Sequence, residues 1–209
     1  MTAAVITTLA TVVRWEPGTR ERLQVAALEL FVSQGFEQTT TAEIANRVGL
    51  TERTFFRHFS DKREVLFHGQ HEFLQAFLDG IDAAPSEASP FELVSAALRS
   101  AAAFFPDGRR AQARTRQGVI DQNHALRERE LHKLAGLATA VAEALRGRGV
   151  GEPAATLAAE SGTTVFGIAF AQWIQAGEER SLADITGDVL RELVAFAGPV
   201  AARPQTASR

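Results

Sequence analysis

Residues 39–59 read TTTAEIANRVGLTERTFFRHF, and the fold follows from this stretch. Two short helical patterns, at about 41–47 and 52–59, are joined by a turn at 48–51 that contains Gly49. Apolar residues of the first helix and the turn would pack the two helices together. Two helices joined by a short glycine-containing turn form a helix-turn-helix, whose second helix enters the DNA major groove.

The second helix of this motif carries positive charge but no carboxylate after Glu52. Its polar positions are Arg53, Thr54, Arg57 and His58. A charged, solvated face alone is ordinary for a surface helix. The helix-turn-helix spacing and the nearby Lys62 make DNA contact the better interpretation. Phe55 and Phe59 are expected in the core, where they would anchor the helix.

N-cap signals mark where the helices begin. They are Thr40 with Glu43, Thr51, and Asp61 with Glu64. A helix over 20–34, capped by Thr19 and ended by Gly35, is predicted upstream. A continuous helix over 62–81 is predicted downstream.

Helical patterns separated by Pro- and Gly-containing breaks continue to the end of the chain. They cover 91–105, 110–120, 123–146, 154–176 and 182–197, and the sequence shows no strand pattern. The fold class is therefore all-α with about nine helices. A three-helix helix-turn-helix domain at 19–66 would precede a helical bundle at 67–199 for ligand binding and dimerisation. A flexible extension over 1–18 and a disordered tail over 200–209 complete the prediction. The alternative for the extension is an arm that uses Arg14 on a minor groove or a phosphate.

Charge and composition narrow the function classes. The net charge is −3, but residues 1–63 carry +1 and the remainder −4, which favours site-specific DNA contact over bulk attraction. The absence of cysteine excludes disulfides and thiolate zinc sites. No apolar run of about 18 residues stands out, and the N-terminus lacks a basic signal-peptide region, so a cytoplasmic location is expected.

The order of motifs over residues 20–66 resembles a known family. A helix ending in LFVSQGFEQTT leads into TAEIANRVGLTERTFFRHFSDKREVL, as in the N-terminal domain of TetR-family (tetracycline-repressor-like) transcriptional regulators. The segment TERTFFRHF, the arginine-rich segment before Asn123 and the late Trp173 are similar to the branch that includes the mycofactocin-system regulator. That resemblance implies an apolar or acyl-CoA-like effector.

The DNA contacts implied by the resemblance are Thr40, Thr51, Arg53, Thr54, Phe56, Arg57, His58 and Lys62. The two capping threonines would bind phosphate at helix N-termini. Arg53 and Thr54 would face base edges, and Arg57 would reach a base or a phosphate. His58 and Lys62 would bind phosphate.

Two positions depart from the family pattern. Arg53 stands where the family often has glycine, which predicts a different base preference. Phe56 stands where tyrosine is usual, so its contact with phosphate would be van der Waals only, without a hydroxyl hydrogen bond.

The bundle offers candidate ligand contacts, each with a structural alternative. The aromatic candidates, which would line a cavity or simply fill the core, are Phe104, Phe105, Phe166, Phe170 and Trp173. Arg114, Arg116 and Asn123 would anchor an anionic ligand or lie on the surface. His68 and His71 would share a helix face, but metal binding needs at least a third ligand, so no metal or cofactor is predicted.

The last two helices predict a homodimer. Leu182, Ile185, Val189, Leu193 and Phe196 form a helical stripe, and the helix from Ala154 is small or apolar nearly all round. A symmetric dimer would place its recognition helices about 34–36 Å apart, on a roughly palindromic double-stranded DNA operator.

These features predict a ligand-responsive dimeric transcriptional regulator, in the first place a repressor released from its operator by a small molecule. The alternative is a DNA-binding regulator or architectural protein with a filled core and no effector. An enzyme is disfavoured because the sequence has no cysteine, no GxSxG and no HExxH motif.

Overall fold

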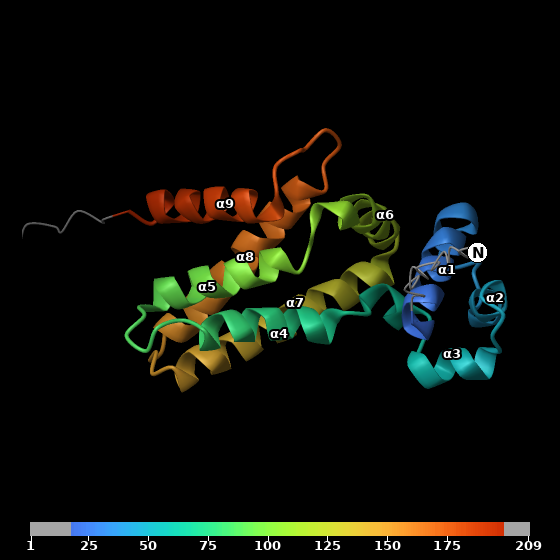
Figure 1. Cartoon of the computed structure of the whole chain (residues 1–209), viewed down its shortest axis with the longest axis horizontal. Helices are drawn as coiled ribbons and strands as arrows, with labels where there is room; N and C mark the ends of the chain where they lie inside the picture. Colours follow the sequence, from blue (N-terminus) through green and yellow to red (C-terminus); the bar gives the residue numbers. More distant parts are fainter. Residues whose placement is uncertain (1–17, 199–209) are drawn as a thin grey trace, which may run out of the picture.

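The computed structural model describes residues 18–198, which form nine α-helices and two 3-10 turns and include no strand. The predicted all-α class is therefore confirmed. The predicted extension, apart from Gly18, and the predicted tail lie outside the described residues. Figure 1 shows a small domain of α1, α2 and α3 at one end of an elongated helical bundle.

The small domain consists of α1 (Thr19–Gln34), α2 (Thr41–Arg47) and α3 (Glu52–His58), close to the predicted bounds. Its core gathers the expected apolar faces of all three helices: Leu23, Ala27, Phe31, Ile44, Ala45, Phe55 and Phe59. The cap expected at Thr19 is wrong, because the N-cap is Gly18 and no side chain bonds to the first turn. The caps at Thr40 and Thr51 are confirmed.

The continuous helix predicted over 62–81 is wrong. Arg63–Phe67 form a 3-10 turn, η1, and α4 (Gln70–Asp82) begins only after Gly69. Gly69 has a φ of 88°, a left-handed conformation that glycine adopts without steric cost and that interrupts the helix. His68 and His71 consequently lie on different elements rather than on one helix face.

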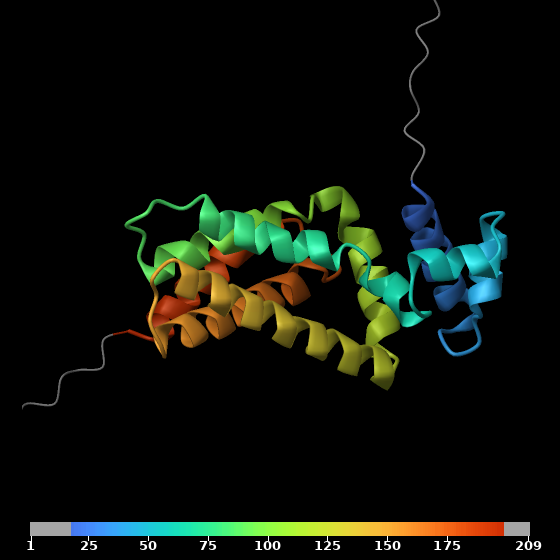
Figure 2. The ribbon, with the colours of Figure 1, turned by 90° about the horizontal axis from the view of Figure 1, so that it is seen from below.

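The bundle follows the predicted order with small shifts at the ends. After α4 come α5 (Pro90–Ala103), η2 (Asp107–Arg109), α6 (Arg110–Asp121), α7 (His124–Gly147), α8 (Ala154–Trp173) and α9 (Leu182–Phe196). Asn123 and Ser181 are the N-caps of α7 and α9, and the side chain of each accepts from a backbone N–H of the first turn. Figure 2 shows α6 standing between the main body of the bundle and the small domain.

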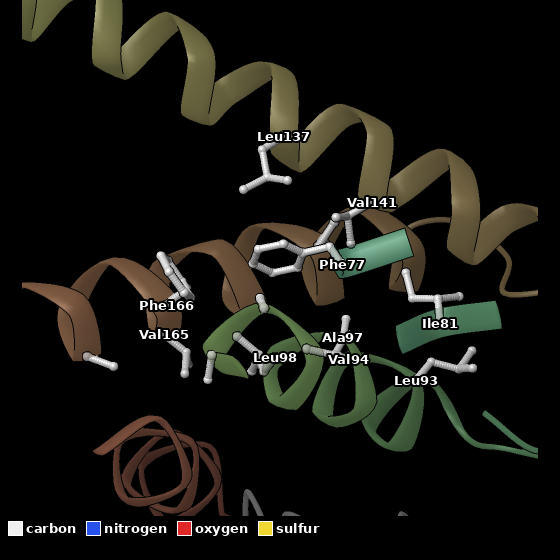
Figure 3. Packing of buried hydrophobic residues seen from close by; sticks show 14 of the residues in the cluster. Phe77, Ile81, Leu93, Val94, Ala97, Leu98, Leu137, Val141, Val165 and Phe166 are labelled. Carbon is white, nitrogen blue, oxygen red and sulfur yellow. The ribbon is translucent and has the colours of Figure 1, made fainter. Parts of the chain in front are cut away.

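The bundle core lies where α4, α5, α7 and α8 converge. Figure 3 shows Phe77 of α4, Leu98 of α5, Val141 of α7 and Phe166 of α8 directed into this space. All four side chains are buried, and Phe77 is only 1% exposed. Dense packing of this kind makes the relative positions of the four helices sensitive to side-chain volume.

Helix α8 is the most apolar of the long helices that the structure describes. Within residues 18–198 it is the one helix whose length and hydropathy would suffice to cross a membrane. It packs against α5, α7 and α9, and its buried face includes Ala159, Gly162, Phe166 and Trp173. Its composition therefore matches that of the central helix of a bundle.

Candidate DNA-binding interface

The turn between α2 and α3 is held by the backbone and by α1. The N–H of Leu50 donates to the Ala45 carbonyl at 2.9 Å, and Gly49 takes a φ of 74°. Arg22 of α1 donates from Nη2 to the Val48 carbonyl at 2.6 Å. These bonds fix the angle between α2 and α3 before any DNA is present.

Helix α3 is anchored by one face and exposes the other. Phe55 is fully buried and Phe59 is 6% exposed, as the sequence predicts. Arg53 and Arg57 are exposed, and among residues 18–198 neither forms an ion pair or a side-chain hydrogen bond. Phe56 is 51% exposed, with its ring edge against Phe55. The exposed face thus offers two unpaired guanidinium groups on a rigid helix.

The capping threonines bond within the domain. Thr40 and Glu43 form a complete capping box, with the Thr40 N–H donating to Glu43 Oε2 at 2.8 Å. That backbone bond and the Thr40 hydroxyl hold the pKa of Glu43 below its ordinary value. Thr51 accepts from the Thr54 N–H at 3.3 Å. Both hydroxyl groups would have to exchange or share these cap hydrogen bonds to reach phosphate. The side chain of the partly exposed His58 forms no hydrogen bond within residues 18–198.

Lys62 does not point away from the domain as a phosphate contact would require. Its Nζ donates to the carbonyls of Phe36 at 2.6 Å, Thr39 at 2.9 Å and Glu37 at 3.4 Å. It also lies 4.3 Å from the centroid of the Phe36 ring. An ammonium group has three donors, and all are used here. Lys62 therefore ties the loop after α1 to the segment after α3.

Replacing Lys62 with methionine should destabilise the small domain. Hydrogen bonds to a charged group are each worth about 1.5–3 kcal/mol, so we expect a loss of about 2–3 kcal/mol in unfolding free energy. Urea unfolding would measure it, with Arg57→Met as a control at an exposed cation. Unchanged stability together with weakened DNA binding would instead return Lys62 to a phosphate-binding role.

The junction between the two domains contains charged residues that sequence reasoning assigned other roles or missed. Glu64 of η1 accepts from Arg129 Nη2 at 2.7 Å and from Lys133 Nζ at 3.1 Å, both on α7. Arg116 of α6 donates from Nε to the Leu66 carbonyl at 2.6 Å and pairs with Glu130 at 3.4 Å. Burial lowers the pKa of the Arg116 guanidinium, and Glu130 opposes that shift.

Apolar packing closes the same junction. Val119 and Ile120 of α6 and Leu126 of α7 belong to the core of the small domain. The Nδ2 of Asn123 donates to Glu37 Oε1 at 2.7 Å. Residues of α6 and α7 therefore complete the core of the small domain, and the ion pairs of Glu64 on η1 join that domain to α7.

The three candidate polar ligand anchors all have partners within the chain. Arg116 and Asn123 belong to the domain junction. Arg114 donates from Nη2 to the Gln175 carbonyl at 2.7 Å and from Nε to the Ile174 carbonyl, so it caps the C-terminal end of α8. None of the three lines either of the grooves described below.

The candidate aromatic residues form a packed cluster rather than the wall of an open cavity. Phe73 lies 4.9 Å from Phe166 and 5.9 Å from Phe104, and Phe170 lies 5.8 Å from Trp173, measured between ring centroids. Trp173 is fully buried and donates from Nε1 to Asp107. The structural alternative of a filled core describes these side chains best.

Two surface grooves lie elsewhere. One, of about 460 Å³, lies between α4 and α7 beside the junction. The other, of about 740 Å³, lies between α1, the end of α2 and α6, where Val25 and Val32 are exposed. Neither groove is predicted from the sequence, because each combines residues from helices far apart in the chain.

Comparison with protein families matches both domains. Residues 23–68 match the model described as bacterial regulatory proteins, tetR family, and residues 88–197 match the model described as the MftR C-terminal domain. The second match alone covers more than half of the chain. This C-terminal match agrees with the resemblance of the sequence to the branch that includes the mycofactocin-system regulator.

Individual relatives and structures extend the likeness. TcmR of Streptomyces glaucescens, an HTH-type transcriptional regulator, is 40% identical over 90 residues, but the match covers only 43% of this chain and 40% of TcmR. MftR of Mycobacterium tuberculosis, a candidate mycofactocin biosynthesis regulator, is 27% identical over 81% of this chain and 86% of its own.

Among solved structures, the regulator FadR of Bacillus subtilis in complex with stearoyl-CoA shares the fold. It has a TM-score of 0.59 at 18% identity, over 84% of this chain and 97% of that chain. Because its helix-turn-helix and its C-terminal bundle match these two family models, the chain belongs to the TetR family of bacterial regulatory proteins, with a C-terminal domain of the MftR type.

Proposed function

We propose that the protein is a dimeric, DNA-binding transcriptional repressor that a small molecule releases from a palindromic operator. The observation that carries this proposal is the exposed face of α3, where Arg53 and Arg57 have no partner within residues 18–198. Arginine can bond bidentately to guanine in the major groove. The buried Phe55 and Phe59 keep that face rigid. A repressor of this kind would act in the cytoplasm, where its operator lies.

The proposed contacts with DNA differ in kind. Arg53 and Thr54 face base edges, and Arg57 reaches a base or a phosphate. His58 and the capping threonines Thr40 and Thr51 lie near phosphate. Phe56 adds a van der Waals contact. Lys62 is left out, because its donors hold the small domain together.

The proposed dimer uses α8 and α9, although much of the expected stripe on α9 packs internally. Leu182 and Ile185 are buried in the protomer's own core. The exposed apolar residues on the two helices are Leu157 and Ile168 of α8 and Val194 and Phe196 of α9, which is 90% exposed. Exposed apolar side chains gathered on two adjacent helices are typical of a subunit interface.

The structure of the domain junction favours a regulator that responds to an effector over a regulator without a ligand. Ion pairs of η1 with α7 join the DNA-binding domain to the wall of a groove. A ligand can shift the conformation only if it binds the DNA-free form more tightly. The filled aromatic core favours the alternative, a DNA-binding regulator without an effector. A fatty acyl-CoA, as in the FadR structure, is the first effector class to test.

The decisive experiment is selection of DNA from a random pool by the full-length protein. We expect an enriched palindromic sequence, bound by two protomers as measured by analytical ultracentrifugation. Addition of acyl-CoA should lower its affinity at least tenfold. Failure to enrich any sequence above the starting pool would contradict DNA recognition. Enrichment that no acyl-CoA affects would favour the regulator without such an effector.

A further inference from the structure

The groove between α4 and α7 is lined by both charged and apolar residues. Arg129 and Lys133 of α7, one helical turn apart, line it together with His71 and His132. Phe73, Leu74 and Leu137 supply its apolar surface. Its volume of about 460 Å³ lies within the usual range for small-molecule sites. A groove of this composition suits a ligand with an anionic head and a hydrocarbon chain.

The two cations of this groove are already neutralised in part by Glu64. Its Oε1 accepts from Arg129 Nε at 2.8 Å, and its Oε2 accepts from Lys133 Nζ at 3.1 Å. The side chains of Glu64 and Lys133 are each 20% exposed, so these charges interact where water screens them only in part. One carboxylate faces two cations, which leaves a formal charge of +1 for a second anion.

One further lining residue has an unmet hydrogen-bonding group. Gln70 stands at the start of α4, and its Oε1 is buried without a donor within residues 18–198. Buried polar atoms are nearly always hydrogen-bonded, so an orphan of this kind is an exception. A hydroxyl or N–H group on a ligand in the groove would supply the missing donor.

We propose that this groove binds the anionic head of an amphipathic ligand, which takes Arg129 and Lys133 away from Glu64. The head would be a carboxylate or phosphate, since both accept from arginine and lysine. The chain would lie along Phe73, Leu74 and Leu137. Figure 3 shows Leu137 above Phe77, at the edge of the bundle core. Because the aromatic cluster is packed, the hydrocarbon chain of the ligand would lie along the edge of the cluster and not inside it.

This competition connects ligand binding to η1. Glu64 lies on the 3-10 turn that follows α3, and its pairs with α7 help to hold the small domain on the bundle. A ligand that takes these cations removes that restraint. By linkage, whatever holds Glu64 on α7 weakens ligand binding by the same factor. The effect on DNA rests on the proposed function, whereas the binding site does not.

The test is calorimetric titration of the full-length protein without DNA. The probes are decyl phosphate and decanoate, with decan-1-ol as the neutral analogue, all below their aggregation concentrations. We expect both anions to bind at least tenfold more tightly than the alcohol. Comparison of the two anions shows whether the site prefers phosphate or carboxylate.

Substitution of the competing carboxylate gives the sharpest result. Glu64→Gln should tighten binding of the anions about tenfold, because the cations lose their internal partner. The double variant Arg129→Gln, Lys133→Gln should weaken it at least tenfold. Glu128→Gln removes the same charge from a carboxylate on α7 that is 69% exposed, and it should change nothing.

A merely structural role for Glu64 predicts that Glu64→Gln leaves anion binding unchanged or weakens it, and either result overturns the inference. Equal binding of decan-1-ol does the same. If the protein selects an operator but shows no such anion site, the proposed function stands without this inference. If the anion site behaves as described but no operator is selected, the inference stands and the proposed function fails.

Discussion

The double substitution Arg53→Ala, Arg57→Ala should weaken operator binding at least a hundredfold while leaving thermal unfolding unchanged. A bidentate contact between arginine and a base is worth about 1–3 kcal/mol of discrimination, and a dimer would lose such contacts on both protomers. Both side chains are exposed and unpaired within residues 18–198, so the fold loses no contact. Fluorescence anisotropy on the selected operator would measure the effect.

The salt dependence of the single variants separates base contacts from phosphate contacts. Loss of a phosphate contact makes the negative slope of log K against log salt less steep by about 0.9. Loss of a base contact mainly relaxes the sequence specificity. The matched control is Arg99→Ala, Arg127→Ala, which removes the same charge from exposed positions of the bundle. If that control weakens DNA binding equally, non-specific electrostatic attraction accounts for the binding, and contacts from α3 do not.

Gly80→Ala should destabilise the bundle, although alanine is the better helix former. A Cβ at Gly80 would lie 2.6 Å from the Ala96 carbonyl oxygen and 2.7 Å from the Ala97 Cα. Both are backbone atoms of α5, so the two helices must separate. Overpacking of this kind costs about 1–3 kcal/mol or more, which exceeds the gain in helix propensity of about 1 kcal/mol. We expect a fall in melting temperature of several degrees.

Gly118→Ala is the matched control, since this glycine lies inside α6 and a Cβ there would meet nothing within 4 Å. It should be neutral or stabilise by up to about 1 kcal/mol. Differential scanning calorimetry of the two variants gives the comparison. A Gly80→Ala protein as stable as the Gly118→Ala protein would show that α4 and α5 can move apart without loss.

Several features of the chain were predictable because they depend on neighbouring residues. Thr40 and Glu43 are three residues apart and bond to each other across one helical turn. Thr51, Asn123 and Ser181 cap their helices through equally local bonds. Interactions of this span are written directly in the residue order. The helix-turn-helix and its exposed arginines follow from such signals.

The break at Gly69 could not be inferred with the same assurance. A single glycine within a helical pattern is usually tolerated, at a cost of about 1 kcal/mol, so its presence alone does not predict a break. Here the apolar side chains Val65, Leu66 and Phe67 are all buried in the small domain, while Phe77 and Ile81 belong to the bundle. Two cores compete for one stretch of chain, and the left-handed glycine separates them.

The sequence by itself determined the all-α class, the helix order, the motif at 39–59 and the family to which the chain belongs. Only the tertiary structure decided what the charged side chains do. Lys62 bonds to carbonyls 23–26 residues away, and Glu64 bonds to cations 65 and 69 residues away. The reason is physical: a cap is closed by the helix that contains it, whereas an ion pair between domains forms only after both cores have packed.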